Sequence, residues 1–483
     1  MQKKFLSNLS FLLVLNLLVK PFYILGIDAE VQERVGENEY GLYFAILNLS
    51  FVFNILNDFG ITNFNNRNIA QNANRFAINF GKLTSSRAAL CIFYAAVTFC
   101  AALFLGYESK EYYLLLFLVI NQVIVSFILF LRSNLAGLHL FKKDSIISVL
   151  DRSLMILFCG ILLWSGQFGG AFEIEWFVYL QTLSYFIALL VAFIFLRGRL
   201  EQLTFRFDWP YTIAILKQSM PYALLILLMS IYFRIDGVML ESLLDTPLEA
   251  GIYAKGYRFL DALYNFSFLF SVLLLPIFAK MISQNENVEK LTALSSKILL
   301  SGVLILCISA AYYSWDIMNW RYSENVLKAS ECFEIIILNG IANSVAYIFG
   351  TLLTAAGVLK KLNVIAICTV MINISLNFIF IPIYGALGAA WASLITLFVS
   401  SLFQAIIAAR HFKMAFNAGL VARLLLLAGF VIALCQGFRL VEYNWFLEFV
   451  LIGVSGLLLS FVIRLFQVQE FIAIIQEEKQ STP

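Results

Sequence analysis

The sequence predicts an all-α integral membrane protein with about fourteen transmembrane helices. Its 483 residues are 61% hydrophobic and only 13% charged, whereas soluble domains carry about 25% charged residues. The mean hydropathy is +0.87. The apolar segments are about 20 residues long, which is the length of a spanning helix, whereas a membrane strand needs only about 10. The net charge of +3 is small and gives no indication of nucleic-acid binding.

The expected spans follow one another along the chain. The first six cover 8–27, 41–60, 88–106, 112–131, 145–166 and 174–196. The next six cover 212–240, 251–279, 291–313, 332–356, 362–381 and 385–409, and two more cover 418–436 and 445–464. The first segment follows two lysines, as a signal peptide would, but Lys20 and Pro21 interrupt it and no clean cleavage site follows. We therefore expect it to be retained as a span.

The loop charges predict the orientation. Most loop cations lie on the side of the N-terminus, namely Arg67, Arg75, Lys82, Arg87, Arg132, Lys142, Lys143, Arg197, Arg199, Arg206, Lys280, Lys290, Lys360, Lys361, Arg410 and Lys413. The opposite loops hold most of the loop acids and only Arg34, Lys110, Arg321, Lys328 and Arg439. Cytoplasmic loops are enriched in Lys and Arg, so both termini are expected in the cytoplasm.

A short motif occurs twice. Glu-x-Gly-x-Tyr is found at Glu39, Gly41 and Tyr43 and again at Glu249, Gly251 and Tyr253, 210 residues later. Six spans separate the copies, and an even number gives both the same orientation, as in a parallel repeat about an axis along the membrane normal. We therefore expect an N-lobe (1–208, spans one to six), a C-lobe (209–413, spans seven to twelve) and an added pair of spans with a cytoplasmic tail (414–483). Two such lobes with a seam between them are typical of a transporter.

In the stretch from Met220 to Asp261, the two apolar segments carry five ionisable residues, which are Arg234, Asp236, Lys255, Arg258 and Asp261. Charges inside apolar segments are costly in lipid and are functional candidates by default. Tyrosines lie between them, including Tyr253 and Tyr257. Arginine and lysine suit a diphosphate, and tyrosine offers a sugar both an apolar face and a hydroxyl. The alternative is that Lys255 and Arg258 snorkel to the outer headgroups while Arg234 pairs structurally with an aspartate.

The first lobe offers two further candidates. Lys20 lies beside Pro21, and a charge at a proline-broken helix lines cavities more often than lipid, although Lys20 is also close enough to the outer interface to snorkel. Asp58 closes span two before a loop with seven asparagines between residues 61 and 81. These amides would suit a glycan headgroup. The alternative is that they form caps and turns and that Asp58 pairs with Arg67.

Several function classes lack their motifs. The chain has no P-loop, no His-Glu-x-x-His, no Gly-x-Ser-x-Gly and no nucleophile beside a base. The loops are too short to hold a soluble catalytic domain. The seven cysteines lie in or beside apolar segments, where they pack as small hydrophobes, and the two histidines are in loops. We therefore expect no enzyme, no cofactor and no metal site.

Two segments resemble a known family. RIDGVMLESLLDTPLEAGIYAKGYRFLD, residues 234–261, resembles the part of bacterial polysaccharide exporters in which an Asp of span seven precedes a Gly-x-Tyr opening of span eight. YGALGAAWASLITLFVSSLFQ, residues 384–404, resembles their twelfth span, whose small residues allow close packing. The chain thus resembles the polysaccharide transporters, including O-antigen (Wzx-like) flippases, of the multidrug/oligosaccharidyl-lipid/polysaccharide exporter (MOP) superfamily.

The resemblance implies a MATE-like pair of lobes that flips an undecaprenyl-diphosphate-linked oligosaccharide across the bacterial inner membrane. The cargo would be a repeat unit of O-antigen lipopolysaccharide, capsule or exopolysaccharide, and a glycan polymerase would be a partner. The diphosphate or acidic sugars would be bound by Arg234, Lys255, Arg258, Tyr253, Tyr257 and Lys20. Asp236, Asp261 and Asp58 would balance these charges or carry a coupling proton. The resemblance does not identify the ion that drives transport or the glycan that is carried.

Three other functions compete with this one. A multidrug antiporter of the same superfamily is expected to hold acids for cationic drugs, whereas the apolar segments between Met220 and Asp261 hold three bases and two acids. A membrane glycan polymerase or lipid-linked glycosyltransferase usually needs a large outer loop or carboxylates at a loop mouth. The largest outer loops, 28–40 and 314–331, are modest. A structural scaffold would leave the charges of these spans without a role.

Overall fold

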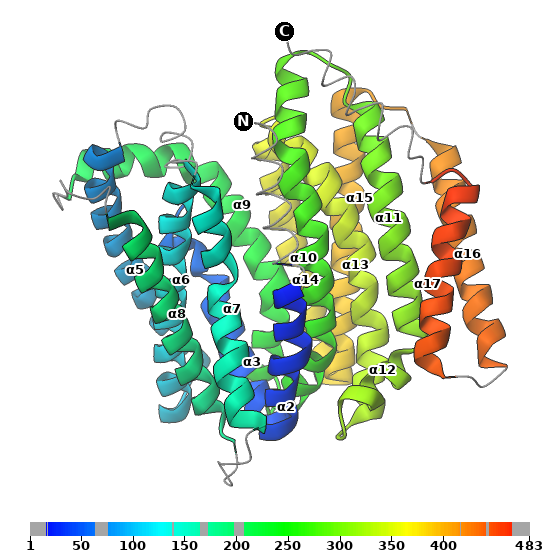
Figure 1. Ribbon diagram of the computed structural model, residues 1–483, viewed down its shortest axis with the longest axis horizontal. Coiled ribbons are helices and arrows are strands. Elements are labelled where there is room, and N and C mark those ends of the chain that lie inside the picture. Colours follow the sequence, from blue (N-terminus) through cyan, green and yellow to red (C-terminus); the bar gives the residue numbers. More distant parts are fainter. Residues whose placement is uncertain are drawn as a thin grey trace. The chain divides into compact units, whose positions relative to one another are not determined.

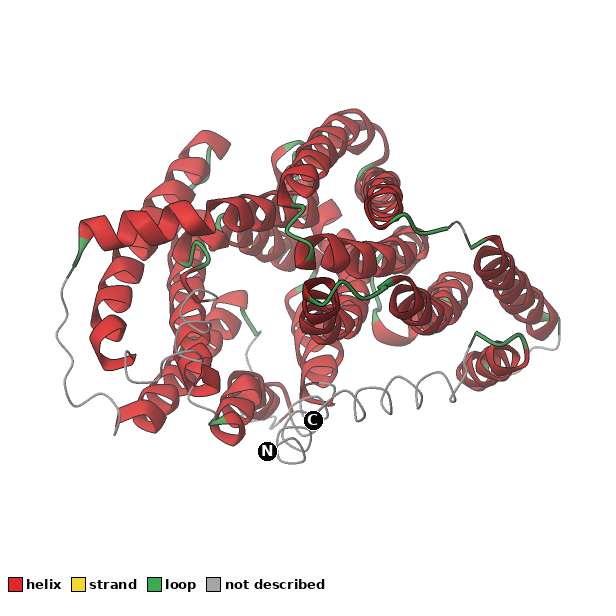
Figure 2. Cartoon of the chain, turned by 90° about the horizontal axis from the view of Figure 1, so that it is seen from above, coloured by secondary structure: helices red, strands yellow, loops and turns green. Residues whose placement is uncertain are grey.

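The computed structural model describes residues 16, 18–62, 76–137, 140–164, 172–197, 207–415, 417–440 and 444–465. These described residues are helical, with no β-strand among them (Figures 1 and 2). Eleven of their helices are long and apolar enough to cross a membrane. The predicted all-α membrane fold is therefore confirmed, and the predicted count of spans is approximate.

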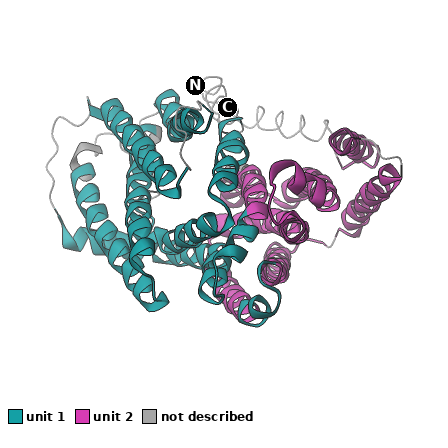
Figure 3. Ribbon diagram, turned by 90° about the horizontal axis from the view of Figure 1, so that it is seen from below, with its two compact units in different colours: residues 1–254, 377–386 teal, residues 255–376, 387–483 magenta. Residues whose placement is uncertain are grey.

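The chain forms two compact units, shown separately by colour in Figure 3. Unit 1 comprises residues 1–254 and 377–386. Its helices are η1 (Tyr23–Asp28, a π-helix), α2 (Ala29–Val35), α3 (Glu37–Val52), η2 (Asn54–Asn57, a 3₁₀ helix), α5 (Phe76–Leu105), α6 (Ser109–Gly137), α7 (Phe141–Trp164), α8 (Ile174–Leu196) and α9 (Trp209–Ser242).

Unit 2 comprises residues 255–376 and 387–483. Helix α10 (Leu248–Ser283) begins in unit 1 and continues in unit 2, and α14 (Leu359–Tyr384) and α15 (Ala386–Phe412) also contribute residues to both. The remaining helices of unit 2 are α11 (Glu289–Tyr312), α12 (Ser314–Arg321), α13 (Val326–Ala355), α16 (Ala418–Arg439) and α17 (Trp445–Val462). The division into lobes 1–208, 209–413 and 414–483 stays a prediction.

The second expected span is shorter than predicted. Helix α3 ends at Val52, and η2 and a turn follow in place of a continuous helix to residue 60. The turn contains Phe59 and Gly60 with φ angles of 48° and 85°, and a positive φ ends a right-handed helix. Helix α9, by contrast, continues through Pro221. Residues 8–15 and 17 of the first expected span lie outside the described residues.

Unit 1 has a core to which five helices contribute. Phe80 and Leu83 of α5, Phe130 of α6 and Ile147 of α7 are buried together with residues of α8 and α9. Because lipid tails are as apolar as these side chains, close packing and interhelical hydrogen bonds hold such helices together. One such bond joins α5 to α9, where the hydroxyl oxygens of Ser86 and Thr212 are 2.6 Å apart. In unit 2, two hydroxyl pairs join α10 to α13.

Polar contacts attach α16 and α17 to the end of α11. The Tyr313 hydroxyl donates to the carboxylate of Glu448, which is 3% exposed, at 2.7 Å. Arg439 donates to the carbonyl of Tyr312 and to Asp316, and so satisfies a carbonyl that a helix end leaves without a partner.

Candidate functional site

Asp236 of α9 lies in a buried polar cluster of unit 1. It is 1% exposed. One carboxylate oxygen accepts a hydrogen bond from Asn377 Nδ2 of α14 at 2.7 Å, and the other accepts one from the Tyr253 hydroxyl at 3.1 Å. The neighbouring Gly237 permits close contact with α3, because an added Cβ would overlap the Asn48 side chain. Buried carboxylates need such partners, so α14 and α10 fix the position of this group.

Arg234 lies two residues before Asp236 in α9 and is half-buried. Its guanidinium carbon is 4.9 Å from the ring centroid of Phe51 in α3, a contact worth about 0.5–2 kcal/mol.

Lys255 is a buried cation of unit 2. It is 1% exposed. Its Nζ donates to the carbonyl oxygen of Glu324 at 2.7 Å and lies 4.9 Å from the ring centroid of Tyr322. Arg258, one turn later, is 4% exposed. Side chains this buried do not reach lipid headgroups, so the snorkelling alternative is wrong for both residues.

Three predicted residues follow Lys255 in the same helix. Tyr257 and Arg258 are buried, and Asp261 is half-buried. Lys255, Arg258 and Asp261 are three residues apart in α10, so they lie on neighbouring turns of one face, as the sequence predicted. This helix packs closely on α13, because a Cβ added at Gly256 would lie 3.1 Å from the Cα of Phe333.

Lys20 of unit 1 belongs to a cluster that includes an arginine the sequence analysis did not single out. Lys20 is half-buried and interacts electrostatically with Arg152 of α7. Arg152 stacks against two tyrosine rings, at 4.5 Å from the Tyr23 centroid and 5.6 Å from the Tyr185 centroid. Asp151 lies 3.7 Å from the same guanidinium. The cluster thus combines cations, an acid and aromatic rings on η1, α7 and α8.

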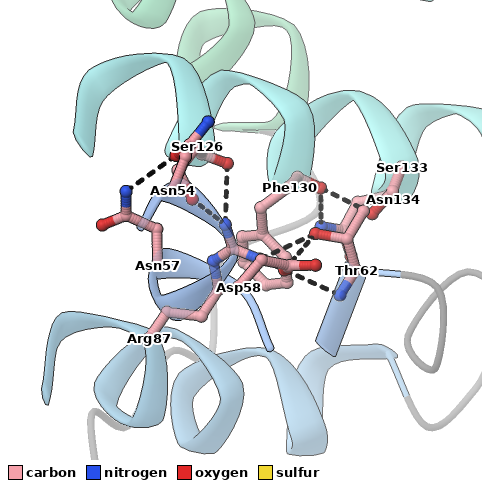
Figure 4. A network of polar contacts seen from close by, with 9 residues as sticks. All are labelled: Asn54, Asn57, Asp58, Thr62, Arg87, Ser126, Phe130, Ser133 and Asn134. Atoms are coloured by element: carbon pink, nitrogen blue, oxygen red, sulfur yellow. Dashed lines mark hydrogen bonds and ion pairs between the residues drawn. The ribbon is translucent and has the colours of Figure 1, made fainter. Parts of the chain in front are cut away.

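Asp58 pairs with Arg87 (Figure 4). Arg87 is completely buried and also donates to the hydroxyl of Thr62 at 2.7 Å and to the carbonyl of Ser126 in α6 at 2.8 Å. Asp58 accepts from the backbone and the hydroxyl of Thr62 as well. The network therefore connects the turn after η2 to α5 and α6.

The sequence analysis was wrong to count Arg87 among the loop cations. It lies inside α5, where Asp58, Thr62 and Ser126 compensate its burial. Arg67, the partner first considered for Asp58, lies outside the described residues. The pair therefore has a structural role in this conformation, and a role of Asp58 in coupling stays a prediction.

The family of the chain follows from a sequence comparison. Residues 5–282 match the family described as polysaccharide biosynthesis protein. The chain belongs to this family. The resemblance to polysaccharide transporters drawn from residues 234–261 and 384–404 is thereby confirmed. No curated protein matches this polysaccharide biosynthesis protein closely enough to add a relative.

Solved structures show which fold this polysaccharide biosynthesis protein has. The lipid II flippase MurJ in its inward closed conformation is similar with a TM-score of 0.71 and 14% identity, over 94% of this chain and 97% of that one. An inward-facing multidrug resistance MATE family transporter of the MOP superfamily follows with a TM-score of 0.61 and 16% identity, over 84% and 98%. A MOP superfamily transporter from Pyrococcus furiosus has a TM-score of 0.54 at 14% identity, over 84% and 93%. The predicted MATE-like fold is confirmed.

The described part of this polysaccharide biosynthesis protein holds no group of three histidine, cysteine or acidic side chains that could bind a metal. Its seven cysteines are free, and five of them are buried. Sequence reasoning did not single out Arg152 and Asn377, and it placed Arg87 in a loop and not within a helix. Each of these residues is polar and lies within or beside an apolar segment. They would have been identified if every amide and arginine in an apolar segment had been considered in the same way as the charges of spans seven and eight.

Proposed function

We propose that this protein is a flippase or exporter that moves a lipid-linked oligosaccharide across the bacterial inner membrane by alternating access. The cargo is a repeat unit of O-antigen, capsule or exopolysaccharide on undecaprenyl diphosphate. Membership of the polysaccharide biosynthesis family carries the proposal. Similarity to a lipid II flippase over 94% of the chain supports it.

The buried cations support an anionic cargo. Lys255 and Arg258 are almost completely buried in α10, and Arg234 is half-buried in α9. Keeping such charges within a membrane protein is costly, and a diphosphate would bind both the lysine point charge and the arginine forks. We assign these three residues, with Tyr253, Tyr257 and Lys20, to cargo binding.

Asp236 is the best candidate for coupling. Its carboxylate is buried, and the amide of Asn377 and the hydroxyl of Tyr253 donate hydrogen bonds to it. A buried acid within an apolar segment is costly in a membrane protein and is a functional candidate by default. Asp261 and Asp58 are assigned to charge balance.

A multidrug antiporter is the second candidate, because two of the similar folds belong to multidrug transporters or their superfamily. Cationic drugs would need an excess of acids. Helices α9 and α10 instead place Arg234, Lys255 and Arg258 beside two aspartates in sequence, so the local charge favours an anionic cargo. A glycan polymerase that uses the flipped cargo is the partner that the proposed function implies.

The test is glycan accumulation in cells that lack the gene. We expect undecaprenyl-linked oligosaccharide to collect in the cytoplasmic leaflet and to be cleared by the wild type. Arg234→Ala should reduce clearance at least about tenfold, because a fork on the phosphate contributes about 1.4 kcal/mol or more. Arg34→Ala is the control, since Arg34 is half-exposed and pairs with Glu30 on the surface. If both variants clear the glycan as the wild type does, the proposed flippase function stands, but Arg234 does not take part in cargo binding. Retention of cationic dyes without glycan accumulation would favour the multidrug antiporter.

A further inference from the structure

Glu241 of α9 has a buried carboxylate oxygen that no donor satisfies. The residue lies in the last turn of the helix, and its Oε2 atom accepts no hydrogen bond from the residues that the structure describes. The last turn carries the negative end of the helix dipole, where a carboxylate is disfavoured and a cation is stabilised. A buried charge is costly unless it is paired. The position of Glu241 therefore favours a positive group beside it.

Glu111, in the first turn of α6, adds a second carboxylate that interacts with Glu241 electrostatically. One of its oxygens accepts from the backbone nitrogen of Glu108 at 2.8 Å. Within the described part of the chain, no lysine or arginine forms an ion pair with either carboxylate. Lys110 instead binds both oxygens of Glu39 at 2.7 Å and attracts Glu111 more weakly. Two like charges thus lie together without a full counter-charge, which is unfavourable.

The hydroxyl of Tyr107 lies near both carboxylates. Tyr107 follows Gly106, whose φ of 76° ends the chain segment of α5, and its backbone nitrogen donates to the carbonyl of Ala102 at 3.3 Å. It is 8% exposed, and its buried hydroxyl has no hydrogen-bond partner among the described residues. Burial raises the pKa of this phenol well above its usual value, and Glu241 and Glu111 raise it further. Three oxygen-bearing side chains therefore meet at one place.

We propose that Glu241, Glu111 and the Tyr107 hydroxyl bind one divalent cation of the kind that prefers oxygen ligands, such as Ca²⁺ or Mg²⁺. Two carboxylates match the charge of such an ion. Helices α5 and α9 end at Leu105 and Ser242, and the last carbonyls of a helix lack intrahelical partners and are available as further ligands. The two acids are 130 residues apart in the sequence, which is why no motif predicted a site here.

The cation would connect the end of α9 to the connection between α5 and α6 within unit 1. These segments are on the side that the charge distribution predicts to face outwards, so the ion would enter from there. Glu241 follows Asp236 by five residues in α9, so the bound ion would stabilise the part of the helix that carries the buried polar cluster. This site does not depend on which cargo the protein moves.

Titration of the purified protein with Ca²⁺ or Mg²⁺ tests the site. After bound metal has been removed with a chelator, we expect calorimetry to show one ion per chain, and the ion to raise the unfolding temperature. Glu241→Gln and Glu111→Gln should each weaken binding at least about tenfold, because a charged ligand is lost, and Tyr107→Phe should weaken it less. Glu108→Gln is the matched control. Its carboxylate is exposed in the same connection, so binding should change at most about twofold.

The metal-free protein separates cation binding from a purely structural role. In chelator, Glu241→Gln should unfold at the same or a higher temperature than the wild type, because it removes the repulsion between the carboxylates. With Ca²⁺ or Mg²⁺ it should unfold at a lower temperature. The site would be overturned if the wild type bound neither ion, or if Glu241→Gln bound them as tightly. Stabilisation of the wild type by acid, with no effect of either ion, would mean that the two carboxylates share a proton instead.

Discussion

Replacing Asp236 with asparagine is expected to abolish glycan clearance while the protein still reaches the membrane in normal amount. Asparagine keeps the size of the side chain and can still accept from Asn377 or Tyr253, so the buried cluster loses one charge but little packing. A coupling group that cannot take up a proton or cation should slow transport at least about 100-fold, which corresponds to ~2.7 kcal/mol. The rate of clearance of accumulated lipid-linked oligosaccharide, normalised to protein in the membrane, measures this.

Asp245→Asn is the control for this variant. Asp245 follows α9 by three residues and is exposed, so its charge should not affect clearance more than about twofold. Clearance by Asp236→Asn at the wild-type rate would show that the carboxylate is not needed, and would remove Asp236 from the coupling role.

Replacing Arg87 with methionine is expected to destabilise the protein by about 3–5 kcal/mol, because it leaves the carboxylate of Asp58 without its cationic partner. Arg87 is completely buried, and Asp58, Thr62 and Ser126 all accept from it. The lost contacts hold the turn after η2, so local opening of residues 53–62 should increase as well. Thermal unfolding of the purified protein and hydrogen exchange of that segment measure the two effects.

The exposed ion pair between Lys110 and Glu39 provides the comparison. Both side chains are nearly half exposed, so Lys110→Met should cost at most about 1 kcal/mol. The double variant Asp58→Asn with Arg87→Met should be less damaging than the sum of the single changes, because the two groups are coupled. Equal losses for Arg87→Met and Lys110→Met would contradict the role given to the buried network.

The sequence predicted the fold because the bilayer restricts the choices. Long apolar segments must be helices, and eleven helices of the described residues, among α5 to α9 and α11 to α17, are long and apolar enough to cross a membrane. The sequence did not reveal the break after Val52. Gly60 is the one strong helix breaker in the sequence around Phe59. The turn is stabilised by Arg87, which is distant in sequence.

The candidate site was predictable in part. Charges in apolar segments identified Asp236, Lys255 and Arg258, all of which are buried. Their partners were not predictable, because Asn377 reaches Asp236 from a segment 141 residues away and Glu324 reaches Lys255 through a backbone carbonyl that no side-chain pattern reveals. The repeat of Glu-x-Gly-x-Tyr indicated symmetry, but the contact between its two glycines required the structure.

Flipping by the purified protein in vesicles tests the central claim most directly. Lipid-linked oligosaccharide extracted from cells that lack the gene would be placed in vesicles with the wild type, and its glycan in the outer leaflet would be followed with an impermeant glycan-cleaving enzyme. We expect the wild type to make nearly all of the glycan accessible, and vesicles with Asp236→Asn or without protein to expose only about half, the outer leaflet's share of a symmetric bilayer. Equal accessibility with and without the wild type, under any imposed proton or sodium gradient, would contradict the proposal that this protein is a flippase.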